Sequence, residues 1–387
     1  MKSSQKNILP HSQAKLDLYQ KYLERYFTIL GLAKRITKVN IYDVFSGTGI
    51  YENGKAGSPI LAFEKVRENR TFFKEKNWSE KLITLTINDV DKSKIELVQS
   101  YIEELNSSKI CEVKYFSSDT SILFPQLVKE LENQSRFERN LLFIDPYGYK
   151  TIDPFNIKRL LDNKRTEIIL FLPVSFMHRF KNVALTEDRK CYQALNDFIK
   201  KLFSDEHPIL TPESLSIENF IEYITEGFNF QNEFYCVNHT IERSKGNLFA
   251  VFFITSHIYG LERMLAVKWE EDKEFGKGHR IKSAQKSLFE KDEKEEIQSI
   301  NYVWLSRNLH DFIERKNQIS NLDLYEFTLT KGFLPKHTNQ ILRDWDEQNS
   351  LFTIDAVTGI EFRKPRTFHN KWDAYKERKP KIFIKLK

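Results

Sequence analysis

The sequence is poor in cysteine, and its three cysteines stand far apart. Cys111, Cys191 and Cys236 form no CxxC pair. Structural zinc and iron–sulfur sites need clustered thiolates, and disulfide frameworks need paired ones. The sequence therefore argues against both, and no set of Asp, Glu and His has the spacing of a metal site either. A reducing cytoplasm is the simplest location for such a chain.

Long apolar runs and a leader pattern are also missing. Residues 1–7 are polar, and no extended apolar segment follows them. The longest apolar stretch, near Ile168–Phe176, indicates a buried strand and is far too short to span a membrane. The sequence therefore predicts no membrane association.

The composition is that of a soluble globular protein, but its positive charge is unevenly placed. Of the 387 residues, 40% are hydrophobic and 29% are charged, which allows two domains with sizeable cores. The net charge is only +6, yet Glu361–Lys387 holds ten Lys and Arg against three acidic residues. A basic end suggests an anionic partner such as nucleic acid, with a merely solvated terminus as the alternative.

Strand and helix patterns alternate through the first half of the chain. Short apolar runs that end in polar turns predict strands at 39–45, 82–87, 111–116, 140–144 and 168–172. Helical spacing precedes the first strand at 14–32 and separates the later ones. This alternation predicts a parallel sheet with helices on both faces, a Rossmann-like α/β fold that binds ligands at the carboxyl ends of its strands.

The remaining elements predict the domain organisation. Helices at 191–203 and 215–228 precede a strand pair, 234–243 and 248–255, which suits the antiparallel end of a seven-strand methyltransferase sheet. We expect a Rossmann-like class I methyltransferase domain at 1–270 and a charged linker at 271–300. Three short helices and a hairpin then predict a winged-helix-like domain with a basic tail at 301–387.

A cofactor motif follows the first predicted strand. Asp43-x-Phe45-x-Gly47-x-Gly49 joins an acidic strand end to a glycine turn, where a side chain would obstruct close approach of a ligand. Glu52 stands where a dinucleotide-binding fingerprint needs its third glycine, and no Walker phosphate loop is present.

Two more carboxylates end the next strands. Asp89 ends the second strand and could accept both hydroxyls of a ribose, while Asp119 ends the third and could accept from an adenine amine. In isolation each could be an exposed turn residue. Together and in this order they predict an S-adenosylmethionine site.

The fourth strand ends in a candidate reaction motif. Asp145-Pro146-Tyr147-Gly148 resembles the Asp-Pro-Pro-Tyr signature of methyltransferases that act on exocyclic base amines, and is closer to the Asp-Pro-Phe-Gly version of some RNA guanine methyltransferases. Asp145 and the carbonyl beside Pro146 would orient an amine, and Tyr147 would stack on a base taken out of its helix. The second Pro is missing, which leaves the stacking role open, and a rigid turn in a non-catalytic domain is the alternative.

In these residues the chain resembles the three-Cys-motif partner protein family. The matching segments are Tyr42–Gly49, Gly57-Ser58-Pro59, Phe143–Gly148 and the run from Thr255 to Trp269. The resemblance implies a bacterial Rossmann methyltransferase that acts beside a radical-SAM-like protein with a three-cysteine motif. It also places Lys15, on the helix before the first strand, among the cofactor-binding candidates.

Residues of the predicted tail suggest contacts with nucleic acid. The third tail helix carries side chains suited to phosphates and base edges, namely Lys336, His337, Asn339, Gln340 and Arg343. A solvated face of a protein-interaction domain is the alternative. His178 and Arg179, after the fifth strand, are secondary candidates for substrate contact, whereas His257 is expected to be a core or capping residue.

The leading hypothesis is therefore a methyltransferase that acts on a base amine of DNA or RNA. One alternative is a methyltransferase with a protein or small-molecule substrate. The other is a non-catalytic module that binds the cofactor or acts as a scaffold with a partner protein.

Overall fold

The computed structural model describes residues 8–78, 80–187, 189–211, 214–244, 246–272, 278–279, 290–362 and 367–387. The chain divides into two compact units, Met1–Arg263 with His279–Ile281 and Met264–Gly278 with Lys282–Lys387. The division falls within helix α9 (Ile258–Glu271), a few residues before the boundary expected at 270.

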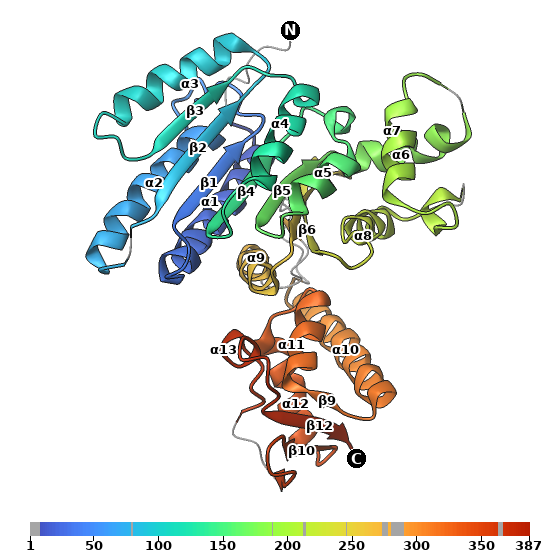
Figure 1. Ribbon diagram of the computed structural model, residues 1–387. Coiled ribbons are helices and arrows are strands. Elements are labelled where there is room, and N and C mark those ends of the chain that lie inside the picture. The colour runs from blue at the N-terminus through green and yellow to red at the C-terminus, as the bar shows by residue number, and fades with distance from the viewer. Residues whose placement is uncertain are drawn as a thin grey trace. The chain divides into compact units, whose positions relative to one another are not determined.

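An eight-stranded sheet is the centre of the first unit (Figure 1). Its strands are β1 (Lys38–Asp43), β2 (Leu82–Asn88), β3 (Glu112–Phe116), β4 (Glu138–Ile144), β5 (Thr166–Leu172), β6 (Tyr235–Ser244), β7 (Asn247–Thr255) and β8 (Gly278–His279). They are arranged in the order β3-β2-β1-β4-β5-β7-β6-β8, with β1 to β5 parallel and β7 antiparallel to both β5 and β6. The order reverses between β1 and β4, which is where open α/β sheets bind ligands. The predicted Rossmann-like fold is confirmed, including its antiparallel strand.

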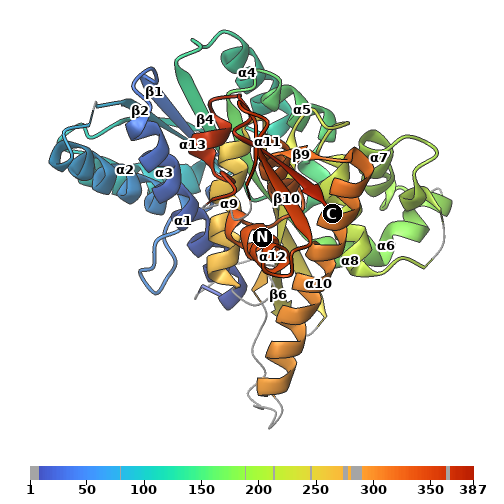
Figure 2. The ribbon, with the colours of Figure 1, turned by 90° about the horizontal axis from the view of Figure 1, so that it is seen from below.

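Helices cover both faces of this sheet (Figure 1). They are α1 (Pro10–Leu32), α2 (Ser58–Glu75), α3 (Lys92–Leu105), α4 (Thr120–Glu132), α5 (Pro154–Leu161), α6 (Val174–Thr186), α7 (Gln193–Leu202) and α8 (Ile217–Gly227), with short 3₁₀ turns at Tyr149–Thr151 and Pro208–Leu210. In both views α6, α7 and α8 lie together (Figures 1 and 2). The helices predicted at 14–32, 191–203 and 215–228 are thus confirmed.

The alternation of side chains along each strand separates two apolar layers. On one face Phe143 stacks on Tyr19 of α1 at 4.2 Å between ring centroids, and Phe253 meets Tyr22 at 4.7 Å. On the other face Leu142 joins a core built with residues of α4 to α8. Burying each such side chain contributes about 1.5–3 kcal/mol, so both helical layers hold the strand ends in fixed positions.

The second unit has its own sheet and its own core. Besides the end of α9, it contains α10 (Glu290–Lys316), β9 (Ile319–Ser320), α11 (Asn321–Thr330), α12 (Pro335–Glu347), β10 (Leu351–Asp355), β11 (Glu361–Phe362), α13 (Trp372–Tyr375) and β12 (Ile382–Leu386). The strand order is β11-β10-β12-β9, and Trp269, Leu309 and Ile341 belong to the core beneath it. The three helices and the hairpin were expected, whereas the winged-helix assignment stays a prediction.

The extent of the expected linker needs correction. The segment 271–300 is not wholly a linker, because α10 begins at Glu290, where Glu and Lys favour helix and extend the predicted helix backwards. Residues 273–277 and 280–289 of that segment lie outside the described residues. The basic tail includes a strand, since β12 pairs with β10 through five residues and buries Ile382 and Ile384. Among the residues that the structure describes, no helix has the length and apolarity to cross a membrane.

The loop after β1 gives a test of the packing. The backbone amide of Gly57 donates to the carbonyl oxygen of Gly49 at 2.6 Å, and a Cβ on Gly57 would lie 2.9 Å from that oxygen. Gly57→Ala should therefore cost about 1–3 kcal/mol of stability, as expected for overpacking against a backbone atom. Gly148→Ala, where an added Cβ meets nothing within 4 Å, is the matched control and should cost less than about 0.5 kcal/mol. Denaturant unfolding of both variants measures the difference, and equal losses would contradict this account.

Candidate functional site

The glycine turn after β1 is held directly against the end of β2. Gly47 and Gly49 have φ angles of 61° and 73°, in the left-handed region that glycine adopts readily. The amide of Gly47 donates to Oδ2 of Asp89 at 3.1 Å, and Asp89 is only 2% exposed. Two predicted cofactor residues, 42 positions apart in sequence, therefore meet by a hydrogen bond.

A buried amide that the sequence did not single out connects three strand ends. Nδ2 of Asn88 donates to the carbonyl oxygens of Val44 at 3.0 Å and Ser118 at 3.1 Å. Its Oδ1 accepts from the amide of Ser118 at 3.0 Å. The ends of β1, β2 and β3 are thus fixed to one another by a single side chain.

Lys94 of α3 bridges two of the predicted site residues. Its Nζ lies 3.3 Å from Oδ1 of Asp89 and donates to the hydroxyl of Tyr147 at 2.8 Å. The ammonium also lies 5.1 Å from the centroid of the Tyr147 ring. Lys94 was not among the predicted site residues, because nothing in the sequence around Lys94 indicates this contact.

Asp43 is a buried carboxylate at the end of β1. Among the described residues, neither of its oxygens has a hydrogen-bond partner of good geometry. The pKa of Asp43 is raised to about 7, mainly by burial and in part by the nearby Asp145, while Ser58, Lys15 and the Phe45 amide act in the opposite direction. This carboxylate is thus positioned to receive a positively charged group.

Lys15 and Asp145 form an ion pair at the end of β4. Nζ of Lys15 donates to Oδ2 of Asp145, and both side chains are largely buried. The same ammonium lies 4.7 Å from the centroid of the Phe171 ring on β5. The structure therefore places Lys15, a predicted cofactor residue, in direct contact with the predicted catalytic carboxylate.

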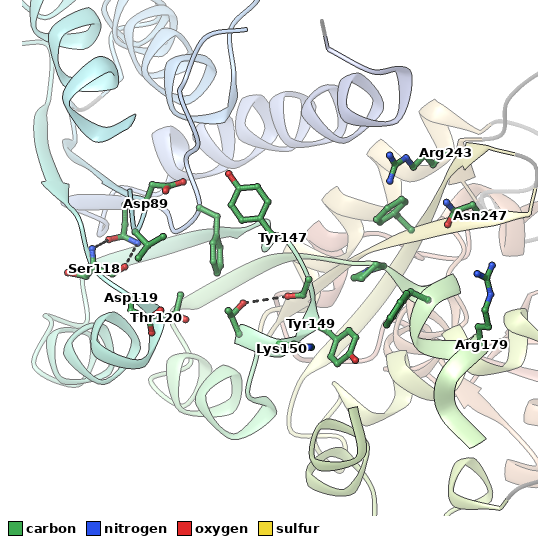
Figure 3. A pocket seen from close by; sticks show the side chains of 18 residues that line it. Asp89, Ser118, Asp119, Thr120, Tyr147, Tyr149, Lys150, Arg179, Arg243 and Asn247 are labelled. Atoms are coloured by element: carbon green, nitrogen blue, oxygen red, sulfur yellow. Dashed lines mark hydrogen bonds between the residues drawn. The ribbon is translucent and has the colours of Figure 1, made fainter. Parts of the chain in front are cut away.

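A cavity of about 710 Å³ opens along this edge of the sheet (Figure 3). The residues that line it are Phe45, Asn88, Asp89, Val90, Ser118, Asp119, Thr120, Tyr147, Gly148, Tyr149, Lys150, Thr151, Pro173, Phe176, Arg179, Arg243, Asn247 and Phe249. Of the predicted set, Phe45, Asp89, Asp119 and Tyr147 are among them. The volume is in the range of small-molecule sites, about 300–1,000 Å³.

The two ends of the cavity carry opposite charge. Figure 3 shows Asp89 and Asp119 at one end, Tyr147 in the middle, and Arg179 and Arg243 at the other end. Asp119 also caps α4, because its Oδ1 accepts from the amide of Ser121 at 2.9 Å. That cap is a structural role besides the predicted contact with a cofactor.

The three residues of the reaction motif lie in different environments. Asp145 is paired as described, Pro146 is buried, and Tyr147 is 83% exposed on the cavity wall. The exposed ring is available for stacking even though the motif lacks its second Pro. Asp145 itself is set back behind this wall, next to Lys15.

Two histidines weighed from the sequence have structural contacts. His178 Nε2 lies 2.6 Å from the carbonyl oxygen of Leu215, and the amide of Tyr259 donates to Nδ1 of His257 at 3.2 Å. The expectation that His257 is a capping residue is thereby confirmed.

Helix α12 in the second unit divides the five predicted nucleic-acid residues. Lys336, Gln340 and Arg343 are exposed on one helical face, whereas Asn339 is half-buried. His337 instead accepts from the amide of Leu334 at 3.1 Å and packs 4.3 Å from the Trp269 ring. Burial lowers the pKa of His337 to about 4, so it is a neutral packing residue at ordinary pH.

One cluster among the described residues has the ligand types for a metal. His310, Asp311 and Glu314 of α10 have ligand atoms within 4.8 Å of one another, and all three are exposed. Exposed acidic groups commonly approach each other in this way, so the cluster carries no metal assignment.

Comparisons with known proteins do not assign the chain to a family. No protein-family model and no curated protein matches it. An O-methyltransferase from Bacillus cereus in complex with SAH matches with 15% identity over 65% of this chain and 83% of its own, at a TM-score of 0.33. The METTL16 methyltransferase domain matches with 11% identity, 62% and 66% coverage, and a TM-score of 0.31. The O-methyltransferase TomG from Streptomyces achromogenes, in complex with SAM, matches with 12% identity, 60% and 80% coverage, and a TM-score of 0.29. These similarities are too low to support a functional argument, which must come from the site itself.

The buried carboxyl of Asp43 predicts a distinctive pH dependence of stability. Its folded pKa of about 7 lies above the ordinary 3.8, so between these values the folded state binds the proton more tightly than the unfolded chain does. The carboxyl therefore contributes stability at low pH, which is lost as the pH rises from about 4 to about 7. One pKa unit corresponds to about 1.4 kcal/mol, so the total loss is on the order of 4 kcal/mol.

Asp43→Asn should remove this loss. Thermal unfolding of both proteins from pH 4 to 8 measures the difference, because the other groups titrate alike in both. Asp205→Asn, at an exposed aspartate, is the control and should keep the wild-type profile. An Asp43→Asn profile parallel to the wild type would show that this carboxyl is not the buried acid described.

Proposed function

We propose that this chain is an S-adenosylmethionine-dependent methyltransferase. The observation that carries the proposal is the hydrogen bond of the Gly47 turn to Asp89, together with the buried Asp43 at the end of β1, beside the switch point of the sheet. Rossmann-like sheets bind nucleoside-containing ligands at that edge. When bound, the cofactor supplies an electrophilic methyl group.

The residues at this edge suit the parts of that cofactor. Asp43 is a buried, unpartnered carboxylate, and the cofactor's ammonium group would offset the cost of its burial. An added side chain on Gly47 would meet nothing within 4 Å, which leaves room beside the turn for the amino-acid moiety. Asp89 is suited to the ribose hydroxyls and Asp119 to the adenine amine, while Phe45 adds apolar surface.

The proposed acceptor is an exocyclic amine of a nucleic-acid base, in DNA or RNA. Asp145 accepts an N–H of the amine and directs its lone pair, and Tyr147 stacks on the base. Lys15, bonded to Oδ2 of Asp145, holds the carboxylate in one orientation. The exposure of Tyr147 at the cavity supports this part of the proposal.

The second unit is proposed to add affinity for nucleic acid. The exposed side chains of Lys336, Gln340 and Arg343 lie on one face of α12, and cations of this kind bind phosphates. The resemblance of the second unit to a winged helix supports this role. Because the chain resembles three-Cys-motif partner proteins, we also propose that it acts with a radical-SAM-like partner protein.

Two rival functions make different predictions. A methyltransferase for proteins or small molecules would transfer label to those classes and not to nucleic acid. A scaffold would need neither Asp145 nor the cavity. Incubation of labelled cofactor with total DNA, total RNA and cell protein side by side separates the three.

Gly47→Val should abolish cofactor binding while the fold survives. The new side chain fills the space beside Asp89 that the proposed cofactor needs, and we expect affinity to fall at least about tenfold. Gly359→Val is the matched control, because Gly359 also has a positive φ, of 69°, and open space around it, but lies in the β10–β11 hairpin. Calorimetry that finds undiminished affinity in Gly47→Val would remove the cofactor assignment.

Asp145→Ala should cut methyl transfer on the order of 100-fold or more, since the acceptor amine loses its orienting partner. Cofactor affinity should change little, because Asp43, Gly47 and Asp89 supply most of the proposed contacts. Tyr147→Ala should cost less, roughly 1–3 kcal/mol if the ring only stacks on the base. Single-turnover transfer to the identified substrate, with calorimetry in parallel, measures both. Wild-type transfer by Asp145→Ala would refute the amine mechanism.

A further inference from the structure

The cavity extends beyond what a cofactor and an amine require. Past Tyr147, its wall is formed by Phe176 and Arg179 of α6 and by Arg243 and Phe249 of the β6–β7 hairpin (Figure 3). None of these residues entered the cofactor or reaction motifs. This far end therefore needs an account of its own.

The two arginines are held on one continuous wall. Oγ of Ser175, in the first turn of α6, accepts from the amide of Leu248 at 2.6 Å and donates to the carbonyl oxygen of Gly246 at 3.4 Å. Ser175 is only 5% exposed, so these bonds are protected from water. The start of α6, with Arg179 one turn further on, is thereby tied to the hairpin that carries Arg243.

The far end is positively charged and has no compensating acid. Among the described side chains, neither Arg179 nor Arg243 has a carboxylate within ion-pair distance. The pKa of nearby His11 is lowered to about 4, mainly by burial and then by Arg243 and Lys15, while Asp145 acts in the opposite direction. An anionic group is the complement of such a wall.

A packed stack of aromatic rings connects Arg243 with the Lys15–Asp145 ion pair. Arg243 lies 6.0 Å from the centroid of the Phe249 ring, which stacks on Phe171 at 5.0 Å and an interplanar angle of 9°. Lys15 lies over Phe171 and bonds to Asp145. Phe171 is buried and Phe249 also stacks on His11, so the aromatic ring most open to the cavity at this end is Phe176, which is 44% exposed. A planar group can lie against Phe176 while an attached anion reaches the arginines.

We infer that Arg179 and Arg243 form a phosphate-binding subsite, so that the acceptor is a nucleotide with its phosphate in place rather than a free base or nucleoside. Guanidinium groups bind phosphate oxygens in paired hydrogen bonds, and aromatic rings stack on unpaired bases. The inference rests on the proposed function and names the class of its acceptor. A base that lies against Phe176 must be unpaired or flipped out of a duplex.

The test uses the full chain and fluorescein-labelled single-stranded 12-mers of mixed sequence, one of RNA and one of DNA. Arg179→Gln and Arg243→Gln should each weaken binding about tenfold, as expected for one lost charge-assisted contact. Each should also reduce the slope of log affinity against log salt by about 0.7, the share of one phosphate contact to a single strand. Arg243→Lys should keep the slope, because it keeps the charge.

Two controls separate this subsite from other cationic surfaces. Arg67→Gln, at an exposed arginine of α2 outside the cavity, should leave affinity and slope unchanged. The double variant Lys336→Gln, Arg343→Gln should lower the slope of log affinity against log salt, because the tail is also proposed to bind. It should not alter the competition of mononucleotides with the strand at the cavity. Cofactor affinity and melting temperature confirm that each variant is folded.

Competition supplies the decisive readout. A mixture of the four nucleoside 5′-monophosphates should displace the labelled strand from the wild type at least about tenfold better than the four nucleosides. In the double Arg179→Gln, Arg243→Gln variant this advantage should vanish. If strands are bound and methylated but the arginine variants behave like Arg67→Gln, the subsite is overturned and the proposed function stands. If no strand is bound and label passes only to protein or small molecules, both are overturned.

Discussion

The buried amide of Asn88 is the interaction on which the rest of the site depends. Parallel strands bring their carboxyl ends to one edge of a sheet, but their loops could still diverge there. Asn88 prevents this, because it donates to the loop after β1 and both donates to and accepts from the loop after β3. Without this amide, three backbone groups would lose this partner, and the buried carbonyl of Val44 alone would cost about 1–3 kcal/mol. The Gly47 turn and the carboxylate of Asp89 derive their relative position from that constraint.

Charge along this edge is separated rather than neutralised locally. Asp43 is buried without a hydrogen-bond partner of good geometry among the described residues. Asp145 is paired to Lys15 from another element, and the arginines lie at the opposite end of the cavity. Burial of Asp43 and of the Lys15–Asp145 pair is costly for an isolated fold, since desolvated charges are stabilised only by partners. Costs of this kind are typical of sites whose partners arrive with a ligand.

The sequence could predict this framework because strand ends are a local signal. Apolar runs that stop at Asp43, Asp89 and Asp145 identify both the strands and the edge at which their side chains meet. Lys94 could not be found in the same way, because its partners depend on how α3 packs against a loop 53 residues further on. His337 shows a different limit: its residue type suggested recognition, but its phase on α12 turns it toward the core. The strand β12 and the start of α10 were not predicted either, because both lie in segments that are rich in charged residues.

The single ammonium of Lys94 has a thermodynamic consequence for the whole edge. It occupies an acceptor oxygen of Asp89 and at the same time fixes the phenol of Tyr147. Any group that takes over that oxygen must change the environment of the ring, and any group that moves the ring must change the carboxylate. Such coupling is reciprocal by linkage, whichever group binds first. The two halves of the cavity are thus energetically coupled. Binding at Asp89 affects Tyr147, and binding at Tyr147 affects Asp89, through Lys94, which belongs to neither motif.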